Sequence, residues 1–259
     1  MYDTIAHYYD VTHADLREDI PFVLGLAAEA GGAVLELGCG SGRLLLPLAR
    51  AGVAVTGVDN SARMVARARA RVAGEATAVQ SLITLVEGDM AALTLPETAR
   101  FALAIVPYNT LLHLTPERTA ALLRGVKGVL GENGRLFIDL INPAAIANTP
   151  DDATLTLENC FTDPESGHTV LQLAANRLDE AEQTLHVTWI YDATPPGGGP
   201  IHRTITQGEY HYLYPHQLEL LLQEAGFRLL TLAGDYDRSP YAEDSPRLLL
   251  LAGKSGQRQ

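Results

Sequence analysis

The fold of this chain is decided by residues 33–44, whose sequence is Ala-Val-Leu-Glu-Leu-Gly-Cys-Gly-Ser-Gly-Arg-Leu. An apolar strand over the first five residues leads into a loop with three glycines, Gly38, Gly40 and Gly42. Glycine lets a backbone adopt positive φ and pass close to a ligand. A second apolar run, 53–58, ends at Asp59, where an acid is placed to accept hydrogen bonds from ribose hydroxyls. The pattern predicts a nucleoside-type cofactor across the carboxyl ends of two parallel strands.

The spacing of the glycines distinguishes between cofactors. The dinucleotide fingerprint is G-x-G-x-x-G, with the pyrophosphate on the helix N-terminus. Here the third glycine comes one residue early, and Arg43 stands where the third dinucleotide glycine is expected. A bulky residue there opposes close packing of helix on strand. The spacing therefore disfavours an NAD(P)-linked oxidoreductase, which we keep as an alternative.

The amino-acid composition and charge of the chain limit the kinds of partner that it can bind. The chain has 259 residues, of which 47% are hydrophobic, so it can form one large α/β domain or a domain with a sizeable insertion. Its formal net charge of −12 and its sequence pI near 5.0 argue against a nucleic-acid partner, which requires a basic face. No apolar run approaches the length of a bilayer span, so no membrane partner is expected.

The cysteines and histidines predict neither a disulfide nor a metal site. Cys39 lies in the glycine loop and Cys160 far from it, and two cysteines cannot form a Cys-rich zinc site. The eight histidines show no H-x-x-x-H spacing. The sequence begins Met-Tyr-Asp-Thr without the basic and apolar regions of a signal peptide. We expect a cytoplasmic protein.

Strands alternate with helices over most of the chain, which predicts a parallel, doubly wound sheet. Strands are expected at 33–37, 53–58, 82–86, 101–106, 135–140, 227–233 and 247–252. Helices are expected at 16–30, from the glycine loop to 51, from a cap at Asn60 or Ser61 to 73, from Thr115 to 131, and at 215–225. The fold class is α/β, a seven-stranded mostly parallel sheet with a reversed C-terminal hairpin, in a single domain spanning 1–259.

The alternation breaks after Pro143. Four runs without an intervening helix are expected to be strands, at 154–161, 168–178, 183–194 and 201–212. Consecutive strands with short turns indicate hairpins. We therefore predict an antiparallel insertion at 151–212 between strands five and six, serving as a lid or a dimerisation surface. A C-terminal helix and strands, 213–253, complete the sheet, and the tail to residue 259 is expected to be loose.

The motifs extend beyond one loop. Glu36 begins an E-x-G-x-G-x-G motif, and Gly57-Val-Asp-Asn-Ser61, Glu87-Gly-Asp-Met90, 101–114 and 130–136 follow in order. With Tyr8-Tyr9-Asp10 near the start, residues 1–142 resemble the class I S-adenosylmethionine (SAM)-dependent methyltransferases. The insertion resembles that of sugar N,N-dimethyltransferases and the glycine N-methyltransferase-like group. The resemblance implies SAM as cofactor, S-adenosylhomocysteine as product, and a SAM-binding core at 33–142.

The resemblance also assigns residues to parts of the cofactor. The glycines would approach its amino-acid end, Asp59 its ribose, and Asp89 and the Met90 N–H its adenine. The remaining expected contacts are Tyr9 at the carboxylate, Glu36 and Cys39 in and before the loop, Asn60 and Met64 near the adenosine, and Val106 and Pro107 beneath the methionine portion. Asp59 as a helix cap, Asp89 as a turn residue and Tyr9 as a packing residue are the alternatives.

Methyl transfer from a sulfonium is an in-line displacement in which positioning and exclusion of water dominate. A base is needed only when the nucleophile carries a proton of high pKa. His113 is the candidate, because histidine titrates near neutral pH and because a histidine falls at this place in the sugar N-methyltransferase-like group. Tyr108, Asn109, His211 and Tyr212 are candidate substrate contacts.

We predict a SAM-dependent enzyme that methylates a small molecule, at nitrogen or oxygen. A non-catalytic SAM-binding protein and a protein methyltransferase are the alternatives that would share this fold. Exposed strands in the insertion need to be covered, which suggests a homodimer.

Overall fold

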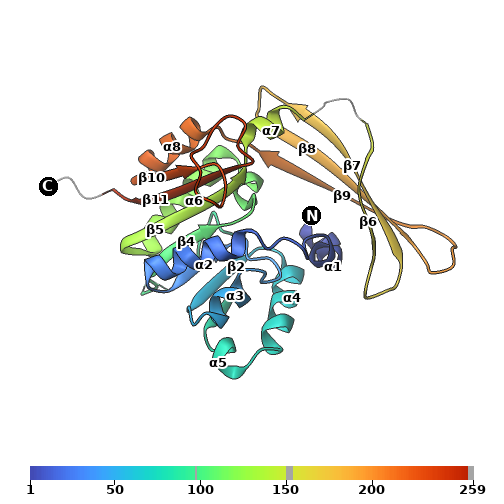
Figure 1. Cartoon of the computed structure of the whole chain (residues 1–259), viewed down its shortest axis with the longest axis horizontal. Helices are drawn as coiled ribbons and strands as arrows, with labels where there is room; N and C mark the ends of the chain where they lie inside the picture. Colours follow the sequence, from blue (N-terminus) through green and yellow to red (C-terminus); the bar gives the residue numbers. More distant parts are fainter. Residues whose placement is uncertain (97, 150–153, 256–259) are drawn as a thin grey trace.

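The computed structural model describes residues 1–96, 98–149 and 154–255, which form two β-sheets with helices around the larger one (Figure 1). The larger sheet has seven strands in the order β10-β11-β5-β4-β1-β2-β3. Its strands are β1 (Val34–Leu37), β2 (Val55–Asp59), β3 (Ile83–Glu87), β4 (Phe101–Val106), β5 (Leu130–Ile141), β10 (Phe227–Ala233) and β11 (Arg247–Lys254). The first five run parallel, while β11 is antiparallel to both of its neighbours. This is the predicted doubly wound sheet with a reversed hairpin.

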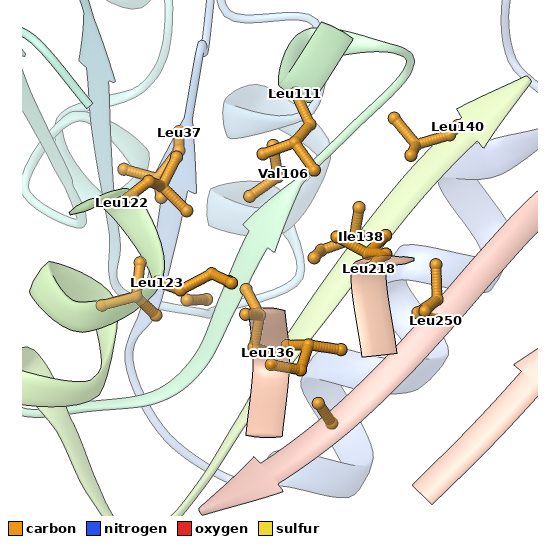
Figure 2. Packing of buried hydrophobic residues seen from close by; sticks show 14 of the residues in the cluster. Leu37, Val106, Leu111, Leu122, Leu123, Leu136, Ile138, Leu140, Leu218 and Leu250 are labelled. Carbon is orange, nitrogen blue, oxygen red and sulfur yellow. The ribbon is translucent and has the colours of Figure 1, made fainter. Parts of the chain in front are cut away.

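Helices cover both faces of this sheet. One core cluster joins it to α6 (Pro116–Val129) and α8 (Pro215–Glu224), and a second joins it to α2 (Asp19–Ala30) and α3 (Leu45–Arg50). Figure 2 shows the first cluster, where Leu122 of α6 lies beside Leu37 of β1 and Leu218 of α8 lies beside Ile138 of β5. The other helices are α1 (Tyr2–Thr12), α4 (Ala62–Ala73), α5 (Thr77–Gln80), the 3-10 helix η1 (Thr110–His113) and α7 (Pro143–Ala147). None of the described helices is long and apolar enough to cross a membrane.

The insertion folds into a separate sheet of four antiparallel strands, in the order β6-β7-β8-β9. They are β6 (Thr156–Thr162), β7 (Thr169–Asp179), β8 (Thr184–Thr194) and β9 (His202–His211). Residues 151–153 of the predicted insertion, and 256–259 of the tail, lie outside the described residues. The sheet extends away from the larger one on the right of Figure 1, with α1 beside it.

Helix α1 was not expected, because we placed the first helix at 16–30, and α2 begins only at Asp19. The N-cap of α1 makes no side-chain hydrogen bond, so local sequence does little to define its start. Packing stabilises it instead: Ile5 and Tyr8 join Val170, Tyr191 and Ala193 of the second sheet in a small buried cluster. Tertiary contacts of an amphipathic face account for most helical stability in proteins.

Several boundaries differ from the prediction, and those around the glycine loop and before β5 have a clear physical reason. The helix after the glycine loop begins only at Leu45, since the glycines hold positive φ and keep the loop out of the helix. Helix α6 ends at Val129, and β5 begins at Leu130 rather than at 135. The expected turn lies inside β5 as an irregularity opposite Phe101. A Cβ at Gly134 would lie 2.9 Å from the Leu130 Cβ and 3.0 Å from the Phe101 carbonyl oxygen, so this close approach requires glycine.

Candidate active site

A cavity of about 420 Å³ lies at the carboxyl ends of β1, β2 and β4. Such ends, where strand order reverses, are where open α/β sheets bind ligands. The lining comes from α1, the glycine loop, the segments after β2, β3 and β4, and α6. The lining residues are Met1, Tyr2, Asp3, Tyr9, Gly38, Gly40, Asp59, Asn60, Ser61, Met64, Gly88, Asp89, Met90, Tyr108, Thr110, His113, Leu114 and Arg118.

The glycine loop brings bare backbone to this cavity. Gly38 and Gly40 adopt φ of 72° and 52°, conformations that other residues rarely accept. A Cβ on Gly38 would lie 2.3 Å from the Thr110 Cγ2, so a side chain there would collide with the segment after β4. The Gly40 N–H donates to the Asp59 carboxylate at 2.8 Å. The loop and the end of β2 are thereby fixed to each other.

Asp59 both lines the cavity and supports its surroundings. Its second oxygen accepts from the Ser61 N–H at 2.9 Å, and burial raises the pKa of this carboxyl. Of the two cap candidates, Ser61 caps α4, since its hydroxyl accepts from the Met64 N–H at 3.2 Å. Asn60 is left to line the cavity.

Asp89 has a cationic partner that sequence reasoning missed. Both of its oxygens accept from the Arg118 guanidinium, at 2.8 and 2.9 Å, and one also accepts from the Ala91 N–H. Arg118 lies on α6 and lines the cavity. An adenine amino group at Asp89 would therefore share the carboxylate with Arg118.

Helix α1 forms one wall of the cavity through Tyr2, Asp3 and Tyr9. It is fastened to α4, because the Asp3 carboxylate accepts from the Ser61 hydroxyl at 2.6 Å and from the Arg63 N–H at 3.2 Å. Further along, Asp10 pairs with the Arg67 Nε at 2.8 Å. Burial raises the pKa of Tyr9 to about 12, so its phenol is uncharged.

His113 lines the cavity at the end of η1, where the sequence placed the candidate base. Its Nε2 lies 2.9 Å from the Tyr2 hydroxyl, and the Tyr210 ring lies 4.9 Å from its own ring. Burial lowers the pKa of His113 to about 4, so the imidazole is neutral at pH 7. A group of such low pKa is a weak base and better suited to positioning an acceptor than to removing a strongly held proton.

Tyr108 and Asn109 follow β4 in an uncommon conformation, with φ of 39° and 66°. The Asp139 carboxylate accepts from the Tyr108 N–H at 3.2 Å, and the Asn109 side-chain oxygen accepts from the Ile141 N–H at 2.6 Å. Tyr108 lines the cavity, and its ring lies between the guanidiniums of Arg43 and Arg247. Asn109 is thus committed to holding the loop, whereas Tyr108 faces the site.

Two substrate candidates, His211 and Tyr212, are not among the residues that line the cavity, and their role toward a substrate stays a prediction. The His211 Nδ1 lies 3.0 Å from the Thr184 hydroxyl, and Tyr212 is 3% exposed in the main core. We expected them near the cleft because they lie at the end of the insertion, where β9 ends at His211 and the chain then turns into α8. Tyr210 of β9 instead lies beside His113, with the two ring centroids 4.9 Å apart.

Five expected cofactor contacts are not among the lining residues. They are Glu36, Cys39, Gly42, Val106 and Pro107. The Glu36 Oε2 is buried without a hydrogen-bond partner among the described residues, and burial raises the pKa of this carboxyl to about 8. Val106 is fully buried, and Cys39 packs beneath Gly57, where a Cβ would lie 2.8 Å from its sulfur. Their roles toward a cofactor stay predictions.

Comparison with known proteins agrees with this geometry. Residues 34–134 match the profile of a family described as "Methyltransferase domain". The chain is 32% identical over 130 residues to a carboxy-S-adenosyl-L-methionine synthase from Methylococcus capsulatus, covering 49% of this chain and 52% of that protein, or about half its length. It is 25% identical over 256 residues to a cypemycin N-terminal methyltransferase from a Streptomyces species, covering 97% and 96% of the two chains.

Solved structures share the whole architecture. The CcbJ methyltransferase from Streptomyces caelestis superposes with a TM-score of 0.78 at 28% identity, covering 92% of this chain and 89% of that one. CalS10 from Micromonospora echinaspora, a SAM-bound amino pentose methyltransferase, shares the fold with a TM-score of 0.67 at 18% identity, covering 92% and 90% of the two chains. Residues 34–134 of this chain therefore match a methyltransferase domain, and the chain shares the fold of solved methyltransferases over most of its length.

Proposed function

We propose that this enzyme transfers the methyl group of SAM to a nitrogen atom of a small molecule. The observation that carries the proposal is the neutral His113 imidazole, held by Tyr2 at the cavity wall between α1 and the second sheet. An uncharged amine needs no strong base, because its nitrogen lone pair attacks the methyl group directly. The proteins with related sequence or fold include a cypemycin N-terminal methyltransferase and an amino pentose methyltransferase, and these names support a nitrogen-bearing acceptor.

The residues of the cavity suit SAM. The bare backbone at Gly38 and Gly40 admits a closely approaching ligand, while Asp59 and Asp89 offer acceptors for ribose hydroxyls and an adenine amino group. We assign the cofactor carboxylate to the uncharged Tyr9 hydroxyl. When bound, SAM supplies a methyl group on a sulfonium, whose departure as a neutral thioether needs no acid. The residues of the chain therefore contribute position and exclusion of water.

The acceptor is assigned to the side of the cavity lined by Tyr2, Tyr108 and His113. The Tyr2 hydroxyl lies 2.9 Å from the His113 Nε2, and this contact holds the imidazole ring at the cavity wall. An amine held at this wall would present its lone pair into the cavity. The net charge of −12 argues against a nucleic acid as the acceptor, and the two unpaired cysteines agree with a reducing compartment such as the cytoplasm.

Ligand binding tests the cofactor first. We expect SAM and S-adenosylhomocysteine, but neither NAD nor NADPH, to raise the melting temperature, by several degrees at 100 times the dissociation constant. Asp59→Ala should abolish the shift, whereas Asp15→Ala, which alters an exposed acid outside the cavity, should retain it. Stabilisation by NADPH instead would favour the oxidoreductase alternative.

Radiolabelled SAM then tests the reaction. We expect label to enter small amines and not the alcohols of matching shape, with His113→Ala reducing the rate while leaving SAM affinity unchanged. Binding of SAM without transfer to any amine or cell extract would favour a non-catalytic protein. Label in cell protein rather than in small molecules would favour a protein methyltransferase.

We also propose that the second sheet forms a homodimer through its outer face. Leu157, Leu173, Ile190 and Ile205 are cross-strand partners in one row over all four strands. Leu157 and Ile205 are 56% and 57% exposed, and such an apolar row on an exposed sheet favours association. Light scattering should give the mass of two chains, and Ile205→Glu should give one. A monomeric wild-type protein would remove the proposal and leave the insertion as a lid.

A further inference from the structure

The inner face of the second sheet carries an acid that the proposed reaction does not use. Glu158 lies at an irregularity of β6, where the register shifts between Leu157 and Asn159. Such an extra residue redirects a side chain. The Glu158 carboxylate accepts from the Gln172 Nε2 at 2.8 Å, and the Trp189 side chain also hydrogen-bonds to it. Gln172 and Trp189 lie on the face of the sheet that packs toward α1.

A layer of aromatic rings connects Glu158 with the cavity. The Trp189 and Tyr210 ring centroids are 5.9 Å apart and nearly perpendicular, and Tyr210 in turn lies 4.9 Å from His113. Met1 separates this layer from the cavity, which it lines. Gly208 makes room for Met1, because a Cβ there would lie 2.8 Å from the Met1 sulfur and 2.9 Å from the Trp189 ring.

The negative charge of the Glu158 carboxylate has no cationic partner among the described residues. Within residues 1–96, 98–149 and 154–255, it makes no ion pair, and its hydrogen-bond partners are a neutral amide and a neutral indole. The Gln172 Oε1 is buried without a hydrogen-bond partner in the same described part of the chain. The Glu158 carboxylate and the Gln172 Oε1 are acceptor oxygens on the same face of the sheet as the Trp189 and Tyr210 rings, and they match an ammonium group, which donates hydrogen bonds and is attracted to aromatic rings.

We propose that Glu158, Gln172 and Trp189 bind a protonated nitrogen of the acceptor, one aromatic layer beyond His113. The inference rests on the proposed function, since it names the class of acceptor. A nitrogen that attacks the methyl group must be uncharged, so the ammonium held at Glu158 is a second basic nitrogen. The acceptor is therefore a small molecule with two amino groups, one at His113 and one at Glu158.

The single tryptophan of the chain makes this site directly observable. We would titrate the full-length protein with cyclohexylammonium chloride, and separately with the neutral cyclohexanol at matched ionic strength, following tryptophan fluorescence. The ammonium should give a saturable change and the alcohol none. Glu158→Gln should weaken ammonium binding at least about tenfold, which is about 1.4 kcal/mol. Glu209→Gln makes the same change on an exposed acid of the outer face and should bind as the wild type does.

The outcomes separate the two proposals. Equal responses to the alcohol, an unchanged affinity in Glu158→Gln, or no fluorescence change would overturn the ammonium site, whatever SAM does. Since the titration needs no cofactor, a wild-type protein that fails to bind SAM would refute the proposed function alone. In turnover assays, Glu158→Gln should raise the KM for 1,8-diaminooctane, which is long enough to span the aromatic layer, but not for octylamine. An equal rise for both amines would assign Glu158 a structural role.

Discussion

The two halves of the cavity are constructed in different ways. The half assigned to the cofactor uses mainly backbone and short polar side chains from the segments after β1, β2 and β3, together with Tyr9 of α1, and Gly40 and Asp59 are joined by a 2.8 Å hydrogen bond. The half assigned to the acceptor uses aromatic side chains from segments far apart in the chain. Tyr2, His113 and Tyr210 come from α1, η1 and β9.

The difference separates what the fold requires from what the acceptor requires. A loop whose backbone contacts the ligand tolerates few substitutions, because its conformation itself is the binding surface. Side chains on α1 and the second sheet can change without altering the larger sheet. We therefore expect variants of the first half to affect cofactor affinity and variants of the second to affect turnover.

The largest effect should come from the position where the two halves meet. Asp139 is fully buried, pairs with Arg247 and accepts from the Tyr236 hydroxyl and the Tyr108 N–H. Asp139→Ala would leave a buried guanidinium unpaired, which costs about 3–5 kcal/mol of unfolding free energy. Urea denaturation measures this loss. Asp237→Ala, at an exposed acid in the same C-terminal hairpin, is the control and should change stability by less than about 0.5 kcal/mol.

His113, in the acceptor half, should contribute its own part of the pH dependence of stability. The pKa of His113 falls from its ordinary 6.5 to about 4 through burial. The unfolded chain then binds more protons between these values, so the contribution is complete above pH 6.5 and is lost as pH falls toward 4. It amounts to up to about 3 kcal/mol. His113→Gln should flatten this part of the stability profile, and a slope as steep as the wild type's would contradict it.

The difference between the two halves of the cavity also explains which parts of the fold and of the site could be predicted from the sequence. The glycine loop, Asp59 and the seven-stranded sheet were predictable because strand, loop and helix are adjacent and each has a local pattern. Helix α1 was missed, since its stability comes from the second sheet rather than from a cap. Tyr2 and Tyr210 carried no signal, because only the tertiary fold brings them to His113.

Charged partners were the hardest to foresee. Arg118 is one of several basic residues on α6, and only the position of that helix brings it to Asp89, 29 residues earlier. The same holds for Arg247 and Asp139, which are 108 residues apart and meet through the antiparallel pairing of β11 with β5. Sequence spacing does not predict such pairs, whereas it does predict neighbours on one helix.

Adding a single methyl group to the glycine loop, in the cofactor half of the cavity, should weaken SAM binding. Gly38→Ala would place a Cβ 2.3 Å from Thr110 at a φ of 72°, so the loop must move. We expect SAM affinity to fall about 100-fold, or about 2.7 kcal/mol. Gly52→Ala is the matched control, with φ of 83° and no atom within 4 Å. It carries the same backbone strain and should lose stability while retaining SAM affinity by calorimetry.

The smallest effect should be confined to the second half. Tyr2→Phe removes the hydroxyl that lies 2.9 Å from the His113 Nε2 but keeps the ring that packs against it. We expect kcat for an amine acceptor to fall about tenfold, which is about 1.4 kcal/mol, with SAM affinity unchanged. Tyr241→Phe, which removes a hydroxyl bonded to Asn142 outside the cavity, should leave kcat unchanged. Since the ring of Tyr2 remains in place, a loss of SAM affinity in Tyr2→Phe would show that the two halves are not separable.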